Sequence, residues 1–205
     1  MSGERADGES VGWPVELRGI TETVVTTLGP NDRWNVAALG IDAGDIETDA
    51  DDTVTARTWG RTRTWRNFRD RGEGYVQFTR DPVDFVEAAL AVREQDDPIL
   101  DSADAWVRVT VEQVQTGEDG GTEWVEWALR PVESAVRSEI VPSTNRGHAA
   151  VIEATVAASR LDVDAYERTE LVERLRYFER VVDRCGGPAE RRAFDRLRDL
   201  VDDEW

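Results

Sequence analysis

The chain of 205 residues has one cysteine, one histidine and no lysine. With Cys185 alone, neither an internal disulfide nor a thiolate metal cluster can form. A histidine metal site or a Ser-His-Asp triad would depend on His148, and no G-x-S-x-G nucleophile motif is present. No apolar run approaches the length that spans a bilayer, and the N-terminus lacks a charged-then-apolar leader. Hydrolysis and metal chemistry are therefore disfavoured, and we expect a cytoplasmic protein with no membrane partner.

Charge of positive sign is scarce and comes only from arginine. The 25 basic residues face 43 acidic ones, which gives a formal net charge of −18. Such a surface repels itself at low salt and is tolerated where high salt screens it. We interpret the composition as that of a salt-loving archaeon with a GC-rich genome. It also disfavours nucleic acid as a partner, because duplex binding needs a broad basic face.

Residues 57–71 depart most strongly from this background. They contain six arginines against a single acid, Asp70. Guanidinium groups, hydroxyls and one amide gathered in a short segment are typical of a phosphate site. The alternative is a surface helix whose arginines pair with acidic neighbours.

The hydrophobic pattern predicts three parts: a disordered tail at 1–12, a strand-rich domain at 13–141 and a helical subdomain at 142–205. Strands are expected at 16–28, 34–41, 53–59, 74–79, 105–112 and 123–129. Short helices are expected from Thr62 or Thr64 to Arg69, and from Asp81-Pro82 to Leu90. Three amphipathic helices follow, at 147–161, around 171–185 and from Pro188 onward, with Cys185 in the core. The absence of regular βαβ alternation favours an α+β fold built on an antiparallel barrel.

The strand at 53–59 passes through Gly60 into the helix that starts near Thr62. This corner offers helix N-terminal amides and guanidinium groups together, and both bind phosphate. Successive strand residues point to opposite faces, so not every candidate can reach one ligand. Neither G-x-x-x-x-G-K nor G-x-G-x-x-G occurs, so the corner is no Walker or dinucleotide fingerprint. The candidate phosphate ligands are Thr58, Arg61, Thr62, Arg63, Thr64 and Asn67.

Two further segments are candidates for ligand binding. Asn35, Ala37 and Ala38 lie in a strand whose small residues either support a flat aromatic ring or allow close sheet packing. Asn145 and Arg146 belong to a polar turn that either contacts a ligand or caps the next helix.

Several motifs together resemble an archaeal flavoprotein family catalogued as domain of unknown function 447, over about residues 13–200. They are G-I-T-E-T-V-V-T-T at 19–27, W-N-V-A-A at 34–38, T-x-T-x-x-N-F at 62–68, D-P-x-x-F-V-E-A-A at 81–89, N-R-G at 145–147 and A-V-I-E-A-T-V at 150–156. Gln77 stands where we expect Asn in related sequences.

The resemblance implies a flavin-reductase-like split β-barrel with a C-terminal helical subdomain, forming a homodimer with FMN near the subunit interface. It places Arg61, Thr62, Thr64 and Asn67 near the FMN phosphate. Asn35, Ala37 and Ala38 would line the isoalloxazine ring. Asn145 and Arg146 would be a further contact to the cofactor, either within the subunit or across the dimer.

The favoured function is an FMN-binding oxidoreductase that accepts hydride from a nicotinamide or deazaflavin donor. In such chemistry the protein supplies orientation and electrostatics, so few histidines and cysteines are needed. Two alternatives stay open. One is a flavin-binding module for storage or sensing, and the other is a cofactor-free dimer whose arginines dock an acidic partner.

Overall fold

The computed structural model describes residues 12–44 and 54–201. The expected tail at 1–12 lies almost wholly outside these residues. The described elements, in chain order, are β1 (Ile20–Leu28), β2 (Trp34–Asp42), β3 (Val54–Trp59), α1 (Arg63–Arg71), β4 (Glu73–Thr79), α2 (Pro82–Leu90), β5 (Arg93–Gln95), β6 (Ala103–Asp119), β7 (Thr122–Val136), α3 (Arg146–Ala158), α4 (Arg168–Cys185) and α5 (Pro188–Leu200).

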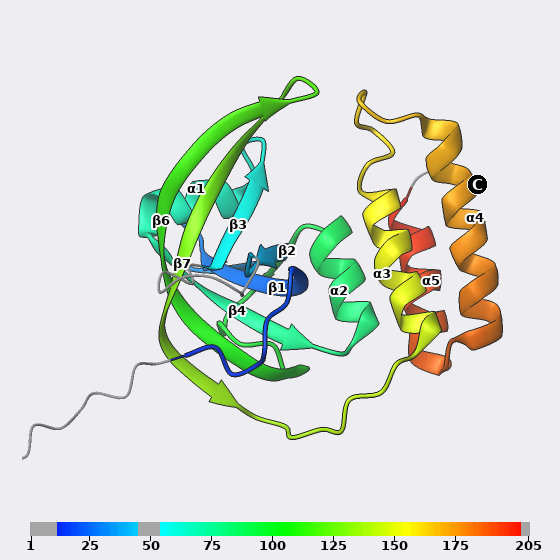
Figure 1. Ribbon diagram of the computed structural model, residues 1–205, viewed down its shortest axis with the longest axis horizontal. Coiled ribbons are helices and arrows are strands. Elements are labelled where there is room, and N and C mark those ends of the chain that lie inside the picture. The colour runs from blue at the N-terminus through cyan, green and yellow to red at the C-terminus, as the bar shows by residue number, and fades with distance from the viewer. Residues whose placement is uncertain (1–11, 45–53, 202–205) are drawn as a thin grey trace, which may run out of the picture.

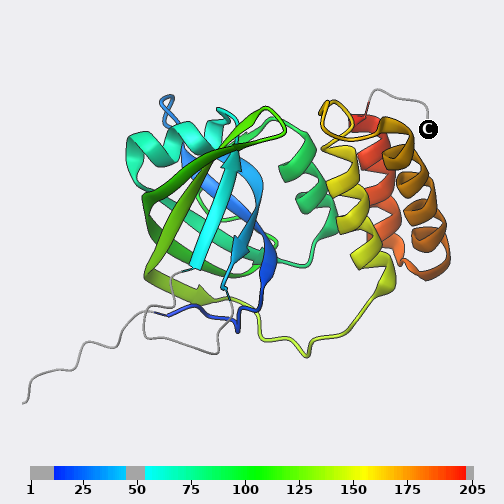
Figure 2. The ribbon, with the colours of Figure 1, turned by 45° about the horizontal axis from the view of Figure 1, so that its top comes forward.

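Six strands close into an antiparallel barrel, shown in Figures 1 and 2. Their order is β1-β4-β6-β7-β3-β2, and pairing of β1 with β2 completes the ring. Alternation along β1 and β6 places Val25, Val107 and Val109 inside, where their side chains are fully buried. The predicted α+β barrel is therefore confirmed.

The strands differ from the sequence prediction at the start of β1, at β5 and, as described below, in the length of the β6–β7 hairpin. β1 begins at Ile20 and not at residue 16, because Gly19 has a φ of +51° and breaks the extended conformation. The strand β5 was not predicted. It has only three residues and adds to the start of β2.

The hairpin of β6 and β7 extends well beyond the residues whose hydrophobic alternation predicted it. The strands extend to Asp119 and from Thr122, well beyond the expected 105–112 and 123–129. Beyond the barrel wall most of the β6 extension is exposed, so no buried face marks it in the sequence. This extension carries the hairpin tip toward the helices (Figure 1).

Helix α1 packs against the barrel. Thr62 caps it by accepting a hydrogen bond from the N–H of Trp65 at 3.2 Å, and Gly72 ends it in the left-handed conformation. Phe68 is 1% exposed and packs edge-on against Trp127, with ring centroids 5.5 Å apart. Asn67 donates to the hydroxyl of Thr27 at 3.0 Å. These contacts fix the helix start relative to the strands.

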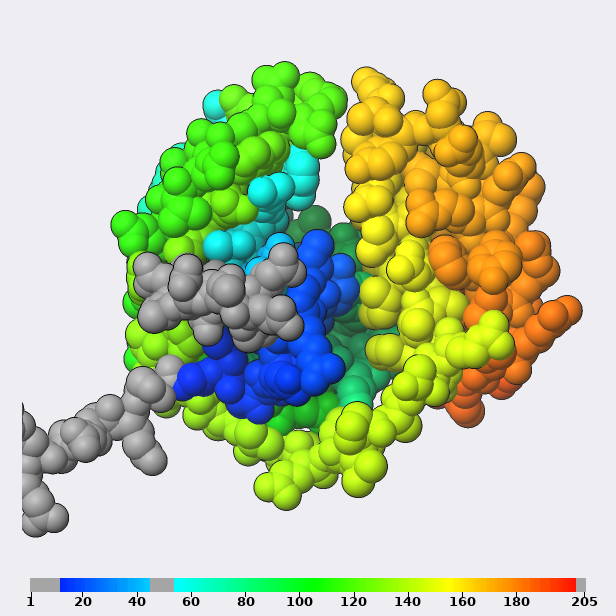
Figure 3. Space-filling view, in the orientation of Figure 1, coloured from blue at the N-terminus to red at the C-terminus, as the bar shows by residue number. Residues whose placement is uncertain are grey.

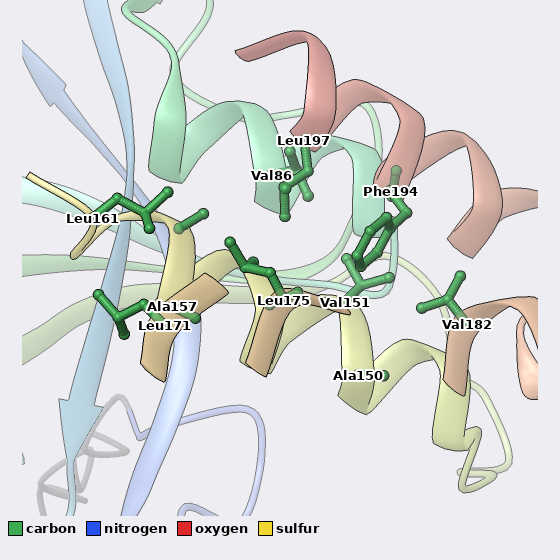
Figure 4. Packing of buried hydrophobic residues seen from close by; sticks show 13 residues of the cluster. Val86, Ala150, Val151, Ala157, Leu161, Leu171, Leu175, Val182, Phe194 and Leu197 are labelled. Atoms are coloured by element: carbon green, nitrogen blue, oxygen red, sulfur yellow. The ribbon is translucent and has the colours of Figure 1, made fainter. Parts of the chain in front are cut away.

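The last three helices pack with α2 into a bundle (Figures 1 and 4). Its core joins Val86 of α2 to Val151, Leu175 and Leu197 of the C-terminal helices. Cys185 is only partly buried, at the last turn of α4, so its predicted place in the core was wrong. No described helix is long and apolar enough to cross a membrane.

Helix α2 links the two halves. Asp81 caps it through two backbone N–H groups and Pro82 occupies its first turn, as the sequence predicted. Its Phe85 and Ala88 pack on the outer face of β1 and β2 with Val24, while the opposite side enters the bundle. The bundle is thereby held against the barrel wall that contains β2.

Candidate functional site

The barrel is split between β2 and β3. Within the described residues these strands pair at two positions, Ile41 with Ala56 and Asp42 with Thr55. Beyond them β3 stays paired with β7 as far as Trp59 and diverges from β2. A cavity of about 550 Å³ opens at this split and continues between barrel and bundle. Figure 3 shows the hollow between the strands and the yellow α3.

Small residues of β2 form one wall. Ala37 is on the side of the barrel core, whereas Ala38 packs with the α2 cluster on the outer face, and Gly40 follows it. Neither alanine is fully buried. A bulky residue at either position would occupy the cavity, so the wall suits a flat group lying against the backbone.

The start of α1 forms the adjoining end. Gly60 has a φ of +65°, and its N–H donates to the carbonyl of Glu123 at 2.7 Å, which turns the chain from β3 toward the helix. Thr62 and Thr64 both line the cavity. The first N–H groups of a helix have no partner within the helix, and no acid lies in this first turn. The end therefore attracts an anion.

Thr58 holds a fixed position between these two walls. Its side chain is 4% exposed and its hydroxyl accepts a hydrogen bond from the indole N–H of Trp127 at 2.9 Å. The hydroxyl is thus oriented by the barrel core.

The opposite wall comes from the bundle and from the β6–β7 hairpin, and no sequence pattern predicted it. It includes Thr155, Val156, Ser159, Arg160, Val163, Ala165 and Tyr166, with Asp119, Gly120 and Thr122 at the hairpin tip. The tip lies against the segment after α3, because a Cβ on Gly120 would stand 2.9 Å from that of Ala165. Helical periodicity in the sequence predicts which face of α3 is buried. It does not predict which strands lie opposite the C-terminal end of α3.

The cavity carries both signs of charge. Arg57 is paired with Glu126 at 2.9 Å and lies over the Trp124 ring. Partial desolvation chiefly, and then the charge of Glu153, raise the pKa of Glu22 against the opposing effect of Arg160, although Glu22 keeps an exposed surface. Glu22 therefore keeps its proton to a higher pH than an ordinary glutamate does.

The structure brings together five of the predicted site residues, Ala37, Ala38, Thr58, Thr62 and Thr64. The two arginines near the start of α1, Arg61 and Arg63, do not line this cavity. Arg61 lies 3.7 Å from Glu123 at a second hollow of about 500 Å³ shared with Trp65. Arg63 is paired with Glu94 at 2.7 Å.

The predicted amides also lie outside the cavity lining. Asn35 is 5% exposed in β2, and Asn67 is bonded to Thr27. Asn145 caps α3 by accepting from the N–H of Gly147 at 2.8 Å, and Arg146 is exposed beside it. Gln77 is fully buried and accepts from the N–H of Leu100 at 2.7 Å. Ligand roles for the asparagines and Arg146 stay predictions.

Several solved structures are similar to this chain. The chain is similar in structure to an FMN-bound protein from Methanosarcina mazei, with a TM-score of 0.74 and 24% sequence identity. The match covers 90% of this chain and 96% of that one, and it supports the fold. Weaker likenesses are found to flavin reductase HpaC in complex with NADP+ (TM-score 0.40, 14% identity, 60% of this chain and 83% of that one). Flavoredoxin from Methanosarcina acetivorans is similar at a TM-score of 0.42, with 11% identity over 67% of this chain and 79% of that one.

Two family models cover most of the sequence. The N-terminal domain of the protein of unknown function DUF447 matches residues 21–138, and the second DUF447 model matches residues 145–199. The chain therefore belongs to the DUF447 family.

Proposed function

We propose that the cavity binds FMN and that the protein is a flavoprotein. One observation carries this: the anion-attracting start of α1 and the alanine wall of β2 line the same cavity. Its volume of about 550 Å³ suits a cofactor, since ligand pockets measure about 300–1,000 Å³. The M. mazei protein of the same family, described as FMN-bound, supports the choice of ligand.

The phosphate is assigned to the start of α1. The amides of Arg63 and Thr64 are the donors there, because the hydroxyl of Thr62 already serves the N–H of Trp65. The hydroxyl of Thr64 adds a neutral donor. Arg61 is 77% exposed and loosely paired, so its guanidinium can turn toward a phosphate at small cost.

The flavin ring is assigned to the wall formed by Ala37 and Ala38. These side chains leave the backbone of β2 open to a planar ring, and the hydroxyl of Thr58 is held at the same split. Phe85 and Val156 supply apolar surface from the helices. The donor set thus fits a molecule with a flat ring and an anionic tail.

We further propose an oxidoreductase with a nicotinamide or deazaflavin donor. FMN supplies the hydride and electron transfer, so the chain needs only to bind, orient and exclude water. The described residues that line the cavity include no histidine or cysteine for other chemistry. That inventory favours cofactor-borne chemistry.

The binding experiment uses Ala38→Leu and a matched control. Leucine at position 38 fills the proposed ring site, so FMN affinity should fall at least tenfold, measured by quenching of flavin fluorescence. Ala149→Leu, on the exposed side of α3, makes the same change outside the cavity and should bind normally. Equal affinities for both variants would contradict the ring placement.

The donor experiment mixes the FMN-loaded protein anaerobically with NADH, NADPH or a reduced deazaflavin. Saturable loss of the flavin's visible absorbance with one donor supports an oxidoreductase. No donor-specific reaction supports the alternative of a storage or sensing module.

We also propose that the protein is a cytoplasmic homodimer from a salt-loving archaeon. The net charge of −18 and the absence of lysine support salt adaptation. Sedimentation in concentrated KCl tests the dimer, and denaturant unfolding in concentrated KCl and in dilute buffer tests salt adaptation. A monomer in KCl contradicts the dimer, and a cooperative, unchanged unfolding transition in dilute buffer contradicts salt adaptation.

A further inference from the structure

We propose that the bundle side of the cavity is a second subsite, where Arg160 anchors a planar organic anion beside the flavin. The inference rests on the proposed function for the placement of FMN against β2. It adds the chemical class of the second reactant, an apolar planar body with one carboxylate or phosphate group.

Two hydroxyl groups on the bundle wall, at the end of α3, are already used in hydrogen bonds. The hydroxyl of Thr155 donates to the carbonyl of Val151 at 2.8 Å, and that of Ser159 to Val156 at 3.0 Å. Both hydroxyl protons are therefore engaged within their own helix. Arg160 and Tyr166 remain as the donors that this wall can offer to a ligand.

The Arg160 guanidinium lies against an aromatic ring and away from the carboxylates of the described residues. In the described part of the chain no carboxylate lies within 4.0 Å of it, in contrast to Arg57, which is 2.9 Å from Glu126 on the barrel side. Its guanidinium carbon lies 5.0 Å from the ring centroid of Tyr166, a cation–π contact that orients it. A partly buried arginine held by an aromatic ring keeps its planar fork of donors for a carboxylate or phosphate.

Apolar side chains surround this cation in the cavity. Val156, Val163 and Ala89 line the same cavity and are apolar. With the ring on the alanine wall of β2, a second planar molecule would lie between that ring and α3. A ligand that satisfies both surfaces is amphipathic, with its charge toward Arg160.

Acidic groups modulate the subsite. Glu22 lines the cavity and interacts with both Arg160 and Glu153, and Asp119 lies at the hairpin tip. Arg57 is offset by Glu126. Because Glu22 is the acid whose charge is coupled to Arg160, its protonation should strengthen anion binding. Glu22→Gln should do the same at neutral pH.

The test titrates FMN-loaded protein with benzoate, phenyl phosphate and neutral benzamide, followed by calorimetry and by the shift of the flavin spectrum. We expect an anion to bind in preference to benzamide, and the two anions decide between carboxylate and phosphate. Arg160→Gln should lower that affinity about ten- to a hundredfold, the effect of one charged hydrogen bond. Arg160→Lys should restore part of it, while Arg176→Gln on the exposed side of α4 should change nothing.

Three results would overturn the subsite: equal binding of anions and benzamide, unchanged affinity in Arg160→Gln, or loss of FMN itself in that variant. Calorimetry on FMN-free protein separates this proposal from the previous one. Arg160-dependent anion binding without any FMN binding refutes the flavin site alone. FMN binding without anion binding refutes the subsite alone.

Discussion

The indole N–H of Trp127 donates to the hydroxyl of Thr58 across 2.9 Å, which connects the barrel core to the cavity wall. Trp127 is 2% exposed and packs against Phe68 of α1. One buried ring therefore contacts both the helix whose start is assigned to the phosphate and the strand that borders the split.

Replacing Thr58 and replacing Trp127 should affect stability and FMN binding differently. Thr58→Val leaves the indole N–H buried without an acceptor, which costs about 1–3 kcal/mol of unfolding free energy. Trp127→Phe removes that N–H together with part of the ring, and the Thr58 hydroxyl keeps the carbonyl of Val125 at 3.5 Å. Denaturant unfolding should therefore show lost stability in both variants, from lost packing in Trp127→Phe and from the unsatisfied indole N–H in Thr58→Val. A separate FMN titration should show lost affinity in Thr58→Val. Full stability and normal FMN binding in Thr58→Val would contradict a positioning role for the bond.

Gly60 should tolerate no ordinary side chain without strain. A Cβ there meets nothing within 4 Å, so the cost comes from its φ of +65° alone. Gly60→Ala should lose about 1–2 kcal/mol of stability, and Gly60→Asn should lose less because Asn enters this region more readily. Chemical denaturation measures both, and an alanine variant as stable as the natural protein would refute the turn geometry.

Glu22 should make stability depend on pH. Burial and Glu153 raise its pKa above the ordinary value of 4.5, so the folded state binds its proton more tightly than the unfolded chain does. Stability therefore falls as pH rises from about 4.5 through the raised pKa of the folded state. Glu22→Gln should be more stable than the natural protein at neutral pH, and this advantage should shrink as the pH falls to 4.5. Glu173→Gln on the exposed side of α4 controls for the loss of one negative charge; the same gain in that control would contradict the assignment.

Gly147 should be irreplaceable because two helices meet there. A Cβ at this position would lie 2.4 Å from the Cα of Gly186 and 2.6 Å from its N. Gly147→Ala therefore forces α3 away from the end of α4 and should cost about 1–3 kcal/mol. Ala149→Gly, two residues further and exposed, should cost about 1 kcal/mol from helix propensity alone. Equal losses in thermal or chemical unfolding would contradict the close approach of the helices.

The sequence was most informative where local chemistry decides the structure. Asp81-Pro82 sets the start of α2, and a threonine cap sets that of α1, because capping and the fixed φ of proline act within one turn. The closed barrel followed from strand alternation and from the family resemblance. The long arm of β6 escaped prediction because its outer residues have no buried face.

The site was only partly predictable for a related reason. Ala38 and Thr62 stood out locally, but the bundle wall with Arg160 depends on how α2 docks the bundle on the barrel. Arg63 pairs with Glu94, 31 residues away in the chain, which no local pattern specifies.

The central claim is that the start of α1 holds a phosphate while β2 supports a ring. The most direct test compares binding of FMN and riboflavin to the natural protein, to Thr64→Val and to Arg61→Ala. We expect FMN to bind more tightly than riboflavin, and Thr64→Val to weaken FMN about tenfold while leaving riboflavin nearly unchanged. An equal effect of Arg61→Ala would add that guanidinium to the phosphate site. Equal affinity of the natural protein for FMN and riboflavin, or equal weakening of both ligands by Thr64→Val, would contradict the account.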